Sequence, residues 1–169
     1  MSMSVHVSGG DLPGLRALES RMREANRSVL VGLPAGAKAE EDGTPVAMIG
    51  AVQEFGSPEQ NIPERSWLRG GIARGQPKFN RLNRANMALV VLGKKTVEES
   101  LGQLGAVAAG EVQREFVVGD FEPIKPATIA ARERKFGKKS TRPLIASGNL
   151  RQEITWQLEP PSSNARVIR

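Results

Sequence analysis

The sequence TVEESLGQLGAVAAGEVQREFVV, residues 96–118, predicts a long central helix. Thr96 and Glu99 have the spacing of a capping box, in which the two residues satisfy each other's backbone N–H groups at a helix start. A helix over this range is roughly 33 Å long at 1.5 Å per residue. Apolar side chains recur along it at steps of three or four residues, as on one face of a helix: Val97, Leu101, Leu104, Ala108, Val112 and Phe116.

Three glycines interrupt this predicted helix, at positions 102, 105 and 110. Each costs a helix about 1 kcal/mol relative to alanine. Such a cost is usually tolerated where another backbone must approach closely. We therefore expect tight helix–helix contact along residues 96–118.

A second amphipathic helix is predicted over residues 77–92, with Pro77 at its start. At 100° per residue, two opposite arcs separate the side chains by type. One arc is apolar (Phe79, Leu82, Met87, Leu89 and Val90), and the other is basic (Lys78, Arg81 and Arg84). This pattern predicts a helix with a basic outer face.

Shorter elements flank these two helices. Before them we expect a weak strand at 3–7, a helix at 12–25, a strand at 28–33, a helix at 44–56 and a loop at 57–65. After them we expect a loop at 120–126, a helix at 128–135, a basic turn at 136–141, an apolar cluster at 144–148 and a strand at 150–158. Leu150, Ile154, Trp156 and Leu158 would share one face of that last strand. The prediction is an α+β fold with a small antiparallel sheet from strands near both ends, in one domain at 1–159 with a polar tail at 160–169.

The composition leaves few routes to catalysis. The chain of 169 residues has no cysteine and one histidine, His6, which excludes thiol nucleophiles, disulfides and histidine triads. Two carboxylate groups are candidates for a small hydrolase: Glu40, Glu41 and Asp42, or Glu98 and Glu99. The first group falls in an expected loop, helix capping explains the second, and Ser147 is better explained as a turn former. We expect no catalytic residue, no cofactor and no metal.

No stretch approaches the roughly 18 apolar residues that span a bilayer, so we expect no membrane partner. The N-terminus lacks the charged start and apolar run of a signal peptide. We therefore expect a soluble protein made in a reducing compartment, or one indifferent to redox conditions.

Charge is distributed unevenly along the chain, which carries a net +6. Residues 65–95 hold eight basic residues and no acid, and residues 125–142 hold seven basic residues and one acid. The remaining residues have nine basic and seventeen acidic side chains. This arrangement suits an acidic partner or charge-complementary self-association, although solvated basic faces explain it equally well.

Non-specific DNA binding or a role as a DNA-packaging accessory is therefore one reading of the basic stretches. The candidate phosphate-binding residues are Lys78, Arg81, Arg84, Arg132, Arg134, Lys138 and Lys139. Aromatic residues do not alternate with them, as a single-strand platform would need, and no helix-turn-helix can be placed.

Three segments carry a resemblance to a known family. They read AVQEFG (51–56) followed by IPERSWLR (62–69), then FEPIKPAT (121–128), and then PLIASGNLR (143–151) followed by Glu153-Ile154. In order and spacing they resemble the tail-completion, or virion-morphogenesis, proteins of tailed bacteriophages. Trp67 stands where the family usually has Phe, and Ala146 where it often has Asp, so any role of that carboxylate does not carry over.

The resemblance implies a non-enzymatic structural subunit at the head–tail junction or the head-proximal end of the tail. Such subunits are expected to form rings, commonly of six copies, around the channel that DNA crosses, beside neighbouring neck and tail-tube or tail-terminator proteins. The expected location is the virion, with the host cytoplasm during assembly. The residues assigned to the subunit interface are Glu54, Phe55, Gly56, Pro63, Arg65, Trp67 and Leu68.

These motif residues also have plain structural roles. We expect Phe55 to pack in the core and Gly56 to take a positive φ at a helix end. Arg65 would hold its loop through a carboxylate such as Glu54 or through backbone carbonyls. Trp67 and Leu68 are read as core residues or as interface anchors. Leu144, Ile145 and Gly148 are assigned to the turn before the last strand.

Overall fold

The structure is a computed structural model, and it describes residues 13–137 and 141–160. In chain order its elements are α1 (Pro13–Glu24), β1 (Val29–Gly32), α2 (Val46–Phe55), the short 3-10 helix η1 (Pro58–Gln60), α3 (Trp67–Val91), α4 (Val97–Val118), α5 (Pro126–Phe136), α6 (Asn149–Gln152) and β2 (Thr155–Leu158). The strand expected at 3–7 and the residues of the tail after Pro160 lie outside the described residues.

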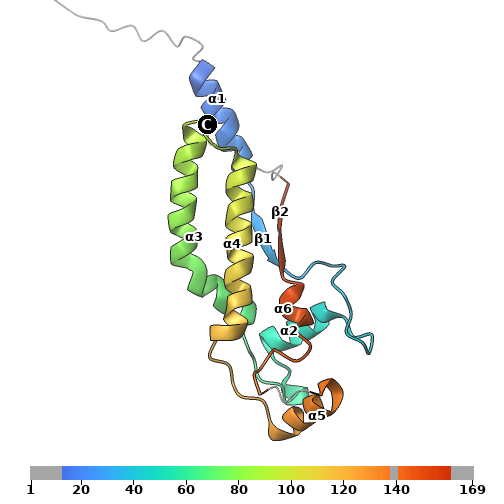
Figure 1. The fold of residues 1–169 in the computed structure, drawn as a ribbon. Helices are drawn as coiled ribbons and strands as arrows, with labels where there is room; N and C mark the ends of the chain where they lie inside the picture. The colour runs from blue at the N-terminus through green and yellow to red at the C-terminus, as the bar shows by residue number, and fades with distance from the viewer. Residues whose placement is uncertain (1–12, 138–140, 161–169) are drawn as a thin grey trace, which may run out of the picture.

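Helices α3 and α4 form a long hairpin at the centre of the molecule (Figure 1). The two strands lie along α4, on its side away from α3, and α1 lies at the end of the hairpin where α3 and α4 are connected (Figure 1). Helices α2, α5 and α6 gather at the opposite end (Figure 1). The molecule is therefore elongated, with α1 and α5 at its two extremes.

Strands β1 and β2 pair antiparallel, from Val29 opposite Leu158 to Gly32 opposite Thr155. They come from near the two ends of the described chain, as the sequence predicts. The fold class, a small antiparallel sheet packed with helices, is confirmed. Trp156 and Leu158 are half-buried while Thr155 and Gln157 are exposed, which confirms the predicted alternation within the strand.

The core has two parts, both centred on α4. The larger part lies toward α2 and α6, where Val46, Trp67, Val112, Phe116 and Leu150 are buried together. The smaller part lies nearer α1 and joins Val90, Val97 and Leu101. The capping box at the start of α4 is present: Thr96 accepts from the Glu99 N–H at 3.1 Å, and the Glu99 carboxylate accepts from the Thr96 N–H at 2.9 Å.

The predicted start of the second helix at Pro77 is wrong, because α3 begins ten residues earlier, at Trp67. Gly70, Gly71 and Gly75 are poor helix formers, so local propensity opposes a helix here. Packing overrides it: Trp67, Gly71, Gly75 and Phe79, spaced four residues apart, form the buried ridge of this half of α3. Pro77 lies inside the helix, and the first part of α3 runs at an angle to the rest (Figure 1).

The strand predicted at 150–158 is half wrong. Leu150 lies in the one-turn helix α6, and β2 begins only at Thr155. Gly148 adopts φ 91° and the Ser147 hydroxyl accepts from the Asn149 N–H at 3.2 Å, which starts a helical turn. Leu150 and Ile154 are four residues apart, a spacing that buries both residues in a helical turn and in a strand alike.

The tight helix–helix contact predicted along residues 96–118 is confirmed, because α3 packs against α4, but the glycines of α4 are not what allows it. A Cβ on Gly105 would lie 2.5 Å from the ring of Trp156, and one on Gly102 would lie 3.2 Å from it, so these glycines make room for a side chain of β2. Nothing lies within 4 Å of a Cβ on Gly110. The close approach of α3 and α4 occurs instead at Gly71, where a Cβ would lie 2.6 Å from the Val112 Cα.

Candidate functional site

The three segments quoted in the sequence analysis (51–56 with 62–69, 121–128, and 143–151 with 153–154) lie at the end of the molecule that carries α2, α5 and α6. Arg65, in the loop before α3, is 5% exposed. Its Nε donates to the backbone carbonyl of Glu122 at 3.0 Å, and an Nη donates to the Gln53 side-chain oxygen at 3.0 Å. Arg65 thus ties the first segment to the second, and the predicted hold through a backbone carbonyl is confirmed.

Arg132 connects helix α5, which begins in the second segment, to the third segment. It projects from α5, and its guanidinium donates to the carbonyl of Arg142 at 2.7 Å and to that of Ile145 at 3.4 Å. Arg65 and Arg132 line one cavity of about 230 Å³, together with Pro63, Glu122 and Lys125. Burial lowers the pKa of both guanidinium groups below the ordinary value of an arginine, and the charge of Arg65 lowers that of Arg132 further.

Glu54 connects α2 to the start of α3. Its side chain is 4% exposed, and its carboxylate accepts from the N–H groups of Leu68 at 2.7 Å and Arg69 at 3.1 Å. The side chain of the N-cap residue Ser66 makes no capping hydrogen bond. Glu54, from the preceding helix, accepts hydrogen bonds from N–H groups in the first turn of α3 in its place. The predicted partner of Arg65 is thus bound to Arg69 instead, whose Nε lies 2.8 Å from the Glu54 carboxylate.

Arg69 is a member of this site to which the sequence analysis assigned no role. Besides Glu54 it pairs with Glu64 at 2.8 Å, and its guanidinium lies 5.2 Å from the centre of the Phe55 ring. A hydrogen bond from Ser66 and then the charge of Arg69 lower the pKa of Glu64. Arg69 lies four residues after Arg65, in the first turn of the helix that begins with Trp67. That position is the feature of the sequence that could have indicated a role for Arg69.

Trp67 is a core residue, which excludes its reading as an exposed anchor. It is 2% exposed, its Nε1–H donates to the Gly50 carbonyl at 3.0 Å, and its ring lies 5.3 Å from that of Phe116. Leu68 and Pro63 are half-buried.

Phe55 is the opposite case. The prediction that it packs in the core is wrong, because it is 68% exposed. It falls on the outer side of α2, since Glu54 and Gln53 occupy the inner side with their hydrogen bonds. Gly56 has φ 75°, as predicted, and a Cβ there would lie 2.9 Å from the Glu64 nitrogen. Phe55 is therefore the one large, exposed apolar side chain among the residues assigned to the subunit interface.

The turn before α6 is built as expected. Leu144 is buried and adopts φ 64°, a left-handed conformation that is rare for leucine. Ile145 is half-buried, and its carbonyl accepts from Arg132. Ser147 donates to the Glu40 carboxylate at 2.7 Å. Ser147 therefore shapes this turn and also connects it to the loop between β1 and α2.

Three of the five candidate catalytic carboxylates, those of Glu40, Asp42 and Glu99, make structural contacts. Glu40 accepts from Ser147 and, at 3.0 Å, from the Asn149 amide. Hydrogen bonds from Thr44 and then from Lys135 lower the pKa of Asp42 to about 2. A hydrolytic pair needs one carboxyl group that keeps its proton near neutral pH, and Asp42 does not meet that requirement. Hydrogen bonds from Thr96 lower the pKa of Glu99.

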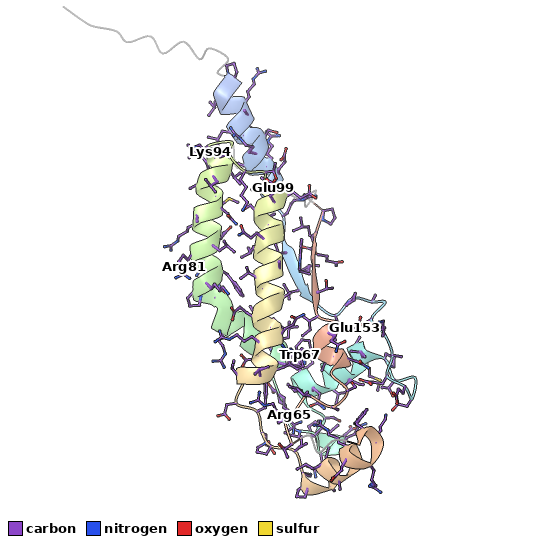
Figure 2. The ribbon with its side chains drawn as sticks, in the orientation of Figure 1. Arg65, Trp67, Arg81, Lys94, Glu99 and Glu153 are labelled. Atoms are coloured by element: carbon purple, nitrogen blue, oxygen red, sulfur yellow. The ribbon has the colours of Figure 1, made fainter. Side chains whose placement is uncertain are left out.

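The predicted basic residues of α3 divide into one that forms an ion pair within the molecule and two that form none with the described residues. Lys78 pairs with Glu111 at 2.8 Å, next to an Arg74–Glu115 pair at 2.6 Å. Arg74 and Lys78 are four residues apart on α3, and their partners Glu115 and Glu111 are four residues apart in the reverse direction on α4. Two basic residues and two acidic residues at this spacing could have indicated how the antiparallel helices align. Arg81 and Arg84 are exposed, and Arg81 projects from the side of α3 away from α4 (Figure 2).

The structure does not bring the two basic stretches together. Helix α5, with exposed Arg134, lies at the end of the molecule opposite the connection of α3 and α4 (Figure 1). Lys138 and Lys139 lie outside the described residues. The predicted DNA-facing residues thus form separate surfaces within residues 13–137 and 141–160.

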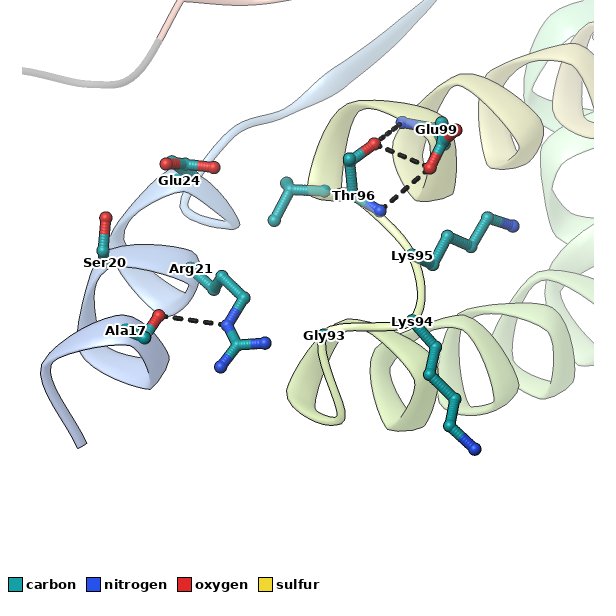
Figure 3. A pocket seen from close by; sticks show the side chains of 10 residues that line it. Ala17, Ser20, Arg21, Glu24, Gly93, Lys94, Lys95, Thr96 and Glu99 are labelled. Carbon is teal, nitrogen blue, oxygen red and sulfur yellow. Dashed lines mark hydrogen bonds between the residues drawn. The ribbon is translucent and has the colours of Figure 1, made fainter. Parts of the chain in front are cut away.

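A broad open pocket of about 510 Å³ lies between α1 and the α3–α4 connection (Figure 3). Arg21 donates to the Ala17 carbonyl within α1 at 3.0 Å and to the Val90 carbonyl of α3 at 3.4 Å. The second hydrogen bond joins the two sides of the pocket. Lys94 and Lys95 extend away from α1 (Figure 3). The cations around this pocket therefore do not converge on a common point.

Within the described residues, no three histidine, cysteine or acidic side chains are grouped so as to hold a metal ion. Across the same residues, no helix has the length and apolar character to cross a membrane. No protein family, curated protein or solved structure matches the chain.

Proposed function

We propose that this protein is a non-enzymatic structural subunit of a tailed-phage virion. It forms a ring, of six copies by our expectation, at the head–tail junction or the head-proximal end of the tail, and completes or joins the tail around the DNA channel. Its partners are copies of itself and the neighbouring neck and tail-tube or tail-terminator proteins. It acts in the virion after assembly in the host cytoplasm.

One observation carries the proposal: a hydrogen bond joins the first resembling segment to the second, and helix α5, which begins in the second segment, is hydrogen-bonded to the third. Arg65 and its partner Glu122 are 57 residues apart in the chain, and Arg132 links α5 to the turn before α6. Segments that resemble one family in the right order are expected to meet in the fold if they belong to one framework. The fixed roles of Glu54 and Trp67 support a framework rather than a reacting site.

Mass spectrometry of purified particles of the phage that encodes the chain tests the proposal. A ring subunit is expected in the virion at a small, constant ratio to the major capsid protein, and it should remain there after a wash in high salt. Absence of the chain from infectious particles would contradict the proposal.

Non-specific DNA binding remains the second candidate, because Arg81 and Arg84 are exposed and make no ion pair within the described residues. Binding through phosphates falls steeply as salt rises. Size exclusion with light scattering, with and without a random-sequence duplex at low and physiological salt, separates the two candidates. A structural subunit should show the same mass with and without the duplex at physiological salt, whereas a DNA binder should shift.

A further inference from the structure

The outer side of α2 is entirely apolar. Ala47, Met48, Ala51 and Phe55 are exposed along it, with Met48 58% exposed and Phe55 68% exposed. The only polar side chains of this helix, Gln53 and Glu54, face inward and are hydrogen-bonded to Arg65 and to the start of α3. A helix that is apolar on its solvent side is normally covered by another surface.

A second exposed apolar surface lies on the outer side of α3. It consists of Ala85, Ala88 and Leu89, together with Leu92, the C-cap residue just beyond the helix, which is 65% exposed. These four residues extend over about 12 Å of helix, and the ten residues of α2 extend over about 15 Å, at 1.5 Å per residue. The two surfaces are thus matched in length.

The charges around the two surfaces are opposite in sign. Residues 39–64, which include α2, hold six acids and no base, and residues 65–95, which include α3, hold eight bases and no acid. Arg69, Arg74 and Lys78 are used in ion pairs within the molecule.

Five of the eight bases make no ion pair with the described residues. Arg65 and Lys95 donate hydrogen bonds to neutral groups, and the other three lie near the outer surface of α3. Arg81 and Arg84 precede its apolar residues and Lys94 follows them, and none of the three makes an ion pair within the described part of the chain. On the other surface, exposed Glu41 and Glu59 flank the two ends of α2, likewise without an ion pair there. Each apolar surface therefore has its own uncompensated rim, one acidic and one basic.

We propose that the outer side of α2 in one copy of this chain packs on the outer side of α3 in a second copy. Met48 and Phe55 bury against Leu89 and Leu92, and the acidic rim faces the basic one. Because the two surfaces are different, the contact is heterologous and joins copies head to tail, which closes into a ring if the rotation allows. This inference rests on the proposed function only for the closure of the ring, since the contact itself follows from the two surfaces.

Site-specific cross-linking tests the contact. Because the chain has no cysteine, a thiol-specific reagent reacts only with the cysteines that are introduced. Met48→Cys and Leu89→Cys variants, on differently sized tags, are mixed and treated with a short bismaleimide. Both positions are exposed, so circular dichroism should match the unmodified chain. We expect the mixed product to exceed either product of like with like. A dominant Met48–Met48 product would overturn the proposal in favour of a symmetric dimer, and no product at high protein concentration would also overturn it.

A charge swap gives an independent readout, the association constant from light scattering. Arg81→Glu with Arg84→Glu, or Glu41→Lys with Glu59→Lys, should each lower it about tenfold or more by placing like charges together. All four substitutions in one chain should restore it. Lys125→Glu, at the residue that precedes α5, combined with Arg134→Glu on α5 is the matched control and should leave it unchanged.

A loss without restoration would overturn the proposed pairing of the two surfaces. The outcome is separate from that of the proposed function, because self-association of the purified chain does not depend on its presence in virions. A partner other than a second copy would appear as a virion protein that cross-links to Met48→Cys while the purified chain alone gives no product.

Discussion

Glu54 is a single side chain on which the junction of two helices depends. Its buried carboxylate accepts two N–H groups at the start of α3 and pairs with Arg69. The sequence places Glu54 at the end of a helix and offers it as one of two possible partners of Arg65. Residues eleven positions apart give no indication of whether Arg65 or Arg69 is nearer to Glu54 in space.

Replacing Glu54 with alanine should destabilise the fold by about 2 kcal/mol, because two N–H groups of α3 and the Arg69 guanidinium lose their acceptor. Equilibrium unfolding in urea measures the loss. Glu133→Ala, at an exposed position on α5, is the matched control and should change stability by less than about 0.5 kcal/mol. Equal effects of the two substitutions would contradict the capping role.

Asp42 should titrate at about pH 2, below its ordinary 3.8, because Thr44 and Lys135 donate hydrogen bonds to its charged form. Since the folded-state pKa is the lower one, this contribution to stability is present above pH 3.8 and is lost as the pH falls toward 2. NMR of the side-chain carboxyl carbon measures the titration. Lys135→Met should raise the pKa only in part, because Thr44 is the larger cause; titration of the unmodified chain at 3.8 would contradict the geometry.

At the scale of elements, the glycines of α4 have distinct roles that substitution can separate. Gly105→Ala should destabilise the protein by about 1–3 kcal/mol, because the new Cβ overlaps the Trp156 ring and either β2 or α4 must shift. Gly110→Ala, in the same helix and facing open space, should instead stabilise it by up to about 1 kcal/mol. Thermal unfolding of the two variants checks both signs. Stabilisation by both substitutions would mean that β2 does not pack on Gly105.

Periodicity was sufficient to predict α1, α2, α4 and the two strands near the chain ends, because each has a regular apolar pattern bounded by a cap, a proline or a glycine. It failed for the first half of α3, whose buried positions are glycines that carry no apolar signal. It failed again at α6, where a four-residue spacing fits a helix and a strand equally. Within the candidate site, the link from Arg65 to a backbone carbonyl was predictable, whereas the exposure of Phe55 was not, since the inner side of α2 is occupied by Glu54 and Gln53.

At the scale of the whole molecule, ion pairs between α3 and α4 neutralise part of the uneven charge of the sequence. Glu111 and Glu115 of α4 are buried against Lys78 and Arg74 of α3, and the Lys78 hydrogen bond lowers the pKa of Glu111. What remains is an acidic rim around α2 and a basic rim around the outer side of α3. This residual pattern favours contacts between copies over a continuous DNA-binding surface.

The most direct test of the assembly account is electron microscopy of lysates from the phage with this gene deleted. We expect filled heads and separate tails, or tails of abnormal end structure, in place of infectious particles. Wild-type protein supplied from a plasmid should restore joined virions. The Met48→Ser, Phe55→Ser variant should not, and its circular dichroism should match that of the wild type because both side chains are exposed. Normal, infectious particles in the absence of the gene would contradict the account.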